Sequence, residues 1–69
     1  MKFNYAKLLG RMREFNHTQE SLAKAIGKNE STLSAKLNIK SYFTTAEICA
    51  ICEVLEIPFK DIPKYFFTV

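Results

Sequence analysis

The sequence predicts an all-α protein of five short helices, followed by a short C-terminal tail of strand-like composition. Three observations carry this prediction: apolar residues recur at three- and four-residue spacing, capping residues precede most of the apolar segments, and glycine or proline follows several of them. Sixty-nine residues, 48% of them apolar, suffice for one small core and no more. Residues 1–69 are therefore expected to form a single domain.

The first predicted helix follows Asn4, a residue typical of N-caps. Phe3 and Leu8 stand where a hydrophobic staple would hold its start. Its apolar side chains fall on one helical face. They are Tyr5, Leu8, Leu9, Met12 and Phe15.

Two short helices with a three-residue connection come next. Thr18 caps the first, which runs through Ile26, and Gly27 can take the left-handed conformation that ends it. The second covers about residues 30–37 and is capped by Asn29 or by the glutamate after it. Two short helices joined by a short turn that contains Gly form a helix-turn-helix unit.

The C-terminal third carries a capping box and two prolines. Residues 44–47 (TTAE) open a fourth helix, which stops before Pro58. Pro58 can begin a last helical turn through about residue 62, and Pro63 is expected to interrupt the helix beyond that point. The tail, residues 65–69, is aromatic and β-branched and favours a strand.

Composition excludes several classes of protein. The start lacks the apolar run of a signal peptide and no apolar run is long enough to span a membrane, so we expect a cytoplasmic protein. Cys49, Cys52 and a lone His17 cannot supply four zinc ligands, and the two thiols are expected to be reduced core groups. No nucleophile and base pair, carboxylate pair or phosphate-binding glycine loop can be assembled, so neither an enzyme, a cofactor nor a small-molecule substrate is expected.

Charge is distributed unevenly along the chain. Residues 1–43 carry eight Lys or Arg and three Glu, a net charge of +5, whereas residues 44–69 carry a net charge of −2. The basic part is the one that would meet a polyanion.

The segment from Thr18 to Asn38, TQESLAKAIGKNESTLSAKLN, resembles the Cro/repressor-like (Xre-type) family of phage regulators, whose pattern is T-Q-x-x-L-A-x-x-x-G followed by a small polar recognition helix. The later runs FTTAEI and I-P-x-x-x-I extend the resemblance over nearly the whole chain. It implies a five-helix lambda-repressor-like domain that binds double-stranded, palindromic operator DNA as a small phage or prophage transcriptional repressor.

The chemistry of the motif can also be argued without the resemblance. Ala23 must be small where the second helix crosses it, and Gly27 allows a backbone angle that a Cβ would penalise by about 1–2 kcal/mol. With Leu33 and Leu37 pointing inward, Ser31 and its neighbours form a small polar face that fits against base edges.

The resemblance assigns base-reading positions to Glu30, Ser31, Ser34 and Ala35, and DNA-backbone contacts to Gln19, Asn29 and Thr32. Three further residues ring the motif and can bind phosphates: Lys28, Lys36 and Lys40. Glu30 either accepts a hydrogen bond from a cytosine amino group or caps the helix dipole. Ile39 stands where relatives have Gly, which is expected to alter the exit turn.

A homodimer through the C-terminal segment is also expected. One small core cannot cover all the large apolar groups near the C-terminus, and exposed apolar surface usually marks an interface. The predicted interface residues are Phe59, Tyr65, Phe66 and Phe67. The tail could pair with its two-fold mate as a strand, fold back as an aromatic plug, or seal the core of a monomer.

A rival function uses the same scaffold. A protein-binding modulator or antitoxin would keep the helix-turn-helix and turn it, or the apolar tail, toward another protein. The moderate net charge and the acidic Glu30 favour this alternative.

Overall fold

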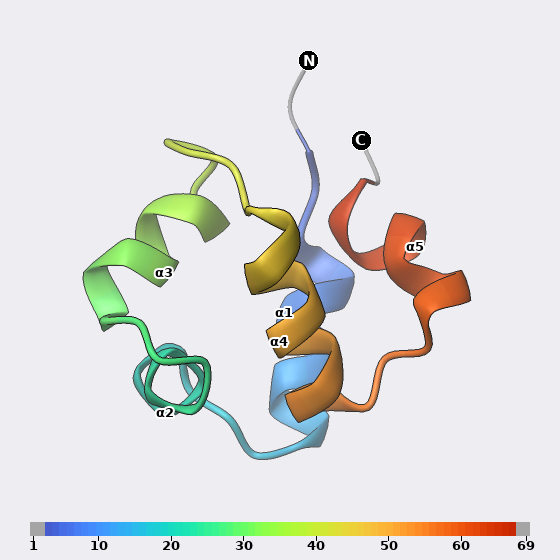
Figure 1. Ribbon diagram of the computed structural model, residues 1–69, viewed down its shortest axis with the longest axis horizontal. Helices are drawn as coiled ribbons and strands as arrows, with labels where there is room; N and C mark the ends of the chain where they lie inside the picture. The colour runs from blue at the N-terminus through green and yellow to red at the C-terminus, as the bar shows by residue number, and fades with distance from the viewer. Residues whose placement is uncertain (1–2, 68–69) are drawn as a thin grey trace.

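The computed structural model describes residues 3–67, and within that range all regular structure is helical (Figure 1). The predicted all-α fold is confirmed. The elements are α1 (Ala6–Glu14), α2 (Gln19–Ala25), α3 (Glu30–Leu37), α4 (Thr45–Leu55), a 3₁₀ turn η1 (Phe59–Asp61) and α5 (Ile62–Phe66).

The helices pack around one core, with α2 and α3 on one side of α1 and α4 and with α5 on the other (Figure 1). α2 packs on α3 and α4, and α5 packs on α1. The largest fully buried side chains come from all five helices and meet at the centre. They are Leu8, Leu22, Leu33, Ile51, Leu55 and Phe66.

Of the two cysteines, Cys52 belongs to this core and Cys49 lies at its edge. Both are free thiols, Cys49 half-buried and Cys52 buried. Burial, together with the nearby Cys49, raises the pKa of the Cys52 thiol. Cys52 is therefore a neutral packing group at ordinary pH.

Side-chain caps start three of the helices. Thr18 Oγ1 accepts from the Ser21 N–H, Asn29 Oδ1 from the Thr32 N–H, and Thr44 Oγ1 from the Glu47 N–H. These caps were predicted, and Asn29 rather than Glu30 holds the start of α3. α1 begins one residue later than predicted, after Tyr5, with Asn4 Oδ1 accepting from the Ala6 N–H at 2.8 Å.

The ends of α1 to α4 share one geometry. Each is followed by a residue with positive φ, and the N–H of the next residue bonds back to the carbonyl five positions earlier, as in a Schellman motif. The positive-φ residues are Asn16, Gly27, Ile39 and Glu56. Only Gly27 was predicted, because glycine is the residue type that most strongly favours this conformation, although asparagine also adopts it at Asn16.

The C-terminal segment corrects two predictions. Pro63 does not interrupt a helix: it lies in the first turn of α5, where its missing N–H costs no hydrogen bond. The tail is not a strand, because Tyr65 and Phe66 belong to α5. Thr68 and Val69, the rest of the predicted strand, lie outside the described residues.

Candidate functional site: the helix-turn-helix face

α2 and α3 form a helix-turn-helix through the connection at residues 26–29. Ala23 is 1% exposed, so the small side chain lies in the core, as predicted. Gly27 has φ +77°, and a Cβ added there would meet nothing within 4 Å. The requirement for glycine is therefore the backbone angle and not space.

The outer side of α3 is small and polar. Glu30 and Ser31 are exposed, while Ser34 and Ala35 are half-buried on the same helix. Several of its polar atoms already have partners: Ser31 Oγ donates to Asn29 Oδ1 at 3.0 Å, and Asn38 Nδ2 donates to the Ser34 carbonyl at 2.9 Å. The four predicted base-reading residues thus share one surface, and what they contact stays a prediction.

A buried carboxylate behind α3 was not predicted as part of the site. Glu47 is 5% exposed and accepts from the Thr44 N–H at 2.8 Å and from the Lys36 ammonium through both carboxylate oxygens. Lys28 Nζ lies 3.9 Å from its Oε2. Burial alone would raise the pKa of Glu47, but the hydrogen bonds from Lys36 and Thr44 outweigh it and hold the pKa below its ordinary value.

This carboxylate bears on one of the predicted phosphate-binding residues. The Lys36 side chain is only 12% exposed and its ammonium is paired with Glu47. Its contact with DNA phosphates stays a prediction. Helical spacing could have indicated this burial from the sequence, because it places Lys36 beside the inward Leu33 and not on the opposite face of α3. Lys28 is partly engaged, with a side chain that is 47% exposed.

The other predicted backbone contacts vary in availability. Lys40 is exposed, and Gln19 and Thr32 are half-buried near the starts of their helices. The Asn29 side chain caps α3. On α1, Arg11 is engaged elsewhere, donating to the carbonyls of Leu55 and Glu56 at 2.9 Å each.

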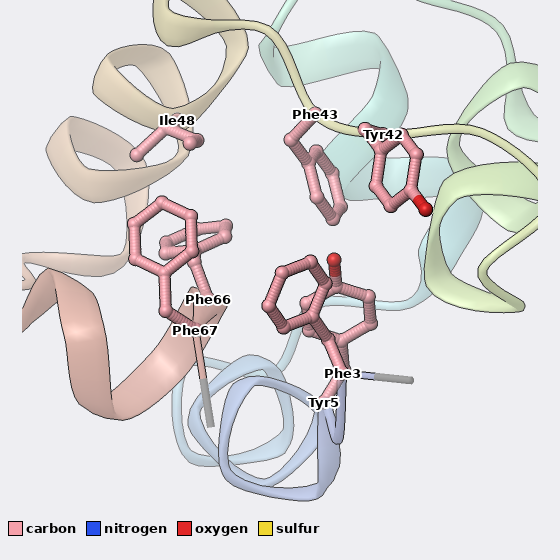
Figure 2. A pocket seen from close by; sticks show the side chains of 7 residues that line it. All are labelled: Phe3, Tyr5, Tyr42, Phe43, Ile48, Phe66 and Phe67. Carbon is pink, nitrogen blue, oxygen red and sulfur yellow. The ribbon is translucent and has the colours of Figure 1, made fainter. Parts of the chain in front are cut away.

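An aromatic cluster joins both ends of the described chain to the segment after α3 (Figure 2). The Phe3 ring lies 6.2 Å from Tyr42 and 5.9 Å from Phe67, centroid to centroid, and both contacts are edge-on. Tyr42 and Phe67 are 66% and 52% exposed. These rings surround a small apolar pocket of about 50 Å³, lined by Phe3, Tyr5, Tyr42, Phe43, Ile48, Phe66 and Phe67.

The predicted dimer residues do not form one surface. Phe66 is 1% exposed and packs edge-on against Phe43 at 5.4 Å, so it belongs to its own core and is not available to a second chain. Tyr65 is half-buried. Phe67 lines the aromatic pocket, while Phe59, 70% exposed, lines a separate groove beside α4. The dimer itself stays a prediction.

The fold and this face define a small all-helical protein built on a helix-turn-helix. The chain belongs to the family described as "Protein of unknown function (DUF739)", whose model matches residues 1–69. The matching model is therefore not that of the Cro/repressor-like family that the motif resembles. No curated protein sequence matches the chain. In addition, none of the helices within residues 3–67 is long and apolar enough to cross a membrane.

One solved structure is similar over nearly the whole chain. It is the solution structure of the modulator of repression (MOR) of the temperate bacteriophage TP901-1 from Lactococcus lactis. The two chains are 45% identical with a TM-score of 0.83, and the match covers 97% of this chain and 90% of that one. The similarity therefore extends through the aromatic cluster and α5, beyond the helix-turn-helix alone.

Proposed function

We propose that this chain is a modulator of repression that acts by binding a repressor protein through its helix-turn-helix face. The similarity to the phage modulator over nearly the whole chain supports this function. The proposal adopts the protein-binding alternative in place of direct operator binding.

The observation that carries the proposal is the ion cluster behind α3. Binding duplex DNA relies on Lys and Arg side chains that displace counterions from phosphates. Here Glu47 holds Lys36 and attracts Lys28, and the exposed carboxylate of Glu30 stands at the start of α3. The face is left with too little free positive charge to hold a phosphate backbone strongly.

The same face has features that suit a protein partner. Ser31 and Ser34 offer hydroxyl groups, and Ala35 lets another backbone approach closely. The exposed ring of Tyr42 follows soon after α3 and can serve as an apolar anchor, since tyrosine is enriched at binding hot spots.

Direct operator binding is the second candidate. It is favoured by the small polar face of α3 and by the exposed Lys40. In this case the chain would be a cytoplasmic repressor that reads a palindromic operator as a homodimer.

Calorimetry with the repressor of the same genome, beside gel shifts on its operator DNA at two salt concentrations, separates the two. We expect Ser31→Arg and Ala35→Glu to abolish repressor binding, and the matched change Lys60→Glu, at an exposed position in η1, to leave it intact. If the chain alone bound operator specifically, and Lys40→Ala reduced the salt slope by about one unit, operator binding would be correct instead.

A further inference from the structure

A groove on another part of the molecule is not used by the proposed function. It lies between the C-terminal end of α4 and η1, has a volume of about 330 Å³, and is lined by Cys52, Glu53, Glu56, Ile57, Pro58 and Phe59. In Figure 1 the connection between α4 and η1 lies on the side of the molecule away from α3. A ligand could therefore bind here while the helix-turn-helix face is occupied.

The floor of the groove is apolar, and its edge carries an exposed ring. Cys52 and Ile57 are buried, whereas Phe59 is 70% exposed, more than any other large apolar side chain in residues 3–67. A large aromatic side chain beside an apolar depression is the usual form of a binding hot spot.

Two carboxylates stand on the same groove. Glu53 and Glu56 are exposed, and neither forms an ion pair within the described residues. The Arg11 guanidinium is held by the carbonyls of Leu55 and Glu56 and by the Glu14 carboxylate. The groove is therefore negative at its rim.

We propose that this groove docks a positively charged, amphipathic segment of a partner protein. An apolar side chain of the segment would sit between Ile57 and Phe59, and its Lys or Arg residues would pair with Glu53 and Glu56. The charges argue against the other occupants. Nucleic acid would bring phosphates against the carboxylates, and a two-fold contact with a second copy would bring two negatively charged grooves together. The proposal does not depend on how the helix-turn-helix face is used.

Nuclear magnetic resonance with ¹⁵N-labelled protein can test this directly. The probe is a short synthetic peptide of Leu and Lys at helical spacing, compared with the same peptide carrying Glu in place of Lys. We expect the Lys peptide to shift the amide signals of Glu53, Ile57 and Phe59, and the Glu peptide to leave them unchanged.

Variants locate the effect. Glu53→Gln with Glu56→Gln should weaken binding of the Lys peptide roughly tenfold, and Phe59→Ala should weaken it by about as much. The matched control, Glu20→Gln with Glu30→Gln, removes the same charge from the helix-turn-helix side and should change nothing. These side chains are exposed, so the far-ultraviolet circular dichroism spectrum should stay unchanged.

Three results would overturn the proposal. The first is a double variant at Glu53 and Glu56 that binds the Lys peptide as well as the parent chain. The second is equal binding of the Glu peptide, which would mean apolar adhesion only. The third is a change in the amide signals of the groove that depends on protein concentration alone, together with a dimer in sedimentation that Phe59→Ala removes. A second copy of the chain would then be the occupant.

Discussion

The helix-turn-helix and the C-terminal segment, residues 56–67, share one core, but their conformations are determined in different ways. In the helix-turn-helix, each start is capped by the residue directly before the helix and the turn is made by Gly27. In the C-terminal segment, the aromatic residues favour a strand and Pro63 was expected to interrupt a helix, yet the segment forms α5 with Phe66 buried in the core. The comparison shows that local sequence signals determine the conformation of a segment where they are strong. Where they are weak, the burial of side chains determines it.

The largest expected effect lies in the C-terminal segment. Phe66→Ala should lower the free energy of unfolding by about 3–5 kcal/mol, because it leaves a cavity at the centre of the core. The neighbouring Phe67→Ala should lower it by less than about 1 kcal/mol, since that ring is half exposed. Urea unfolding followed by circular dichroism measures both, and Phe66→Leu, which should cost at most about 1.5 kcal/mol, keeps the comparison usable if the alanine variant does not fold. Equal losses at 66 and 67 would break the distinction between core and surface in this segment.

Glu47 is expected to have the next largest effect. Glu47→Ala should cost about 3 kcal/mol, because the nearly buried Lys36 loses its counter-charge and α4 loses half of its capping box. Glu47→Gln should cost less, since its amide oxygen can still accept from the Thr44 N–H. Urea unfolding at neutral pH gives both values. If Glu47→Ala left the free energy of unfolding unchanged, the ion cluster of Glu47, Lys36 and Lys28 would not hold α3 against α4.

The same carboxylate predicts an acid-dependent loss of stability. Because the pKa of Glu47 is lowered in the folded chain, its contribution is complete above the ordinary pKa of about 4.3 and is lost as pH falls through the folded value. The free energy of unfolding should therefore fall less steeply with decreasing pH for Glu47→Gln than for the parent chain. Equal slopes in acid for Glu47→Gln and the parent chain would contradict this prediction.

The turn of the helix-turn-helix should show an intermediate effect. Gly27→Ala should cost about 1–2 kcal/mol, entirely from the left-handed backbone angle, because the added Cβ meets no neighbour. Thermal unfolding is sufficient to detect it. If Gly27→Ala unfolds at the parent temperature, the glycine is not required by the angle at all.

The smallest effect is expected at Ile39, where a β-branched residue has φ +62°. Ile39→Asn should change stability by less than about 1 kcal/mol, because relief of the backbone angle offsets the lost packing of a half-buried side chain. The matched control is Ile48→Asn within α4, where no strain is relieved and the loss should be about 2 kcal/mol. Equal losses at the two positions would show that Ile39 carries no strain.

The sequence by itself determined most of the helix starts and the helix-turn-helix. Thr18, Asn29 and Thr44 each accept from the N–H group three residues further along the chain, and Gly27 acts on its own backbone. Because the residues of each such interaction lie within a few positions of one another, these features can be identified from the sequence before any tertiary contact is known. The small polar face of α3 follows from the same helical spacing.

Only the tertiary structure decided which charges remain available and what the C-terminal aromatic residues do. Lys36 and Glu47 are eleven positions apart, and their pairing depends on how α4 packs behind α3. Phe66 and Phe67 are neighbours of identical chemistry, yet one is buried against Phe43 and the other is half exposed. A side chain's partners across the core depend on the packing of distant segments, which local preferences along the chain do not specify.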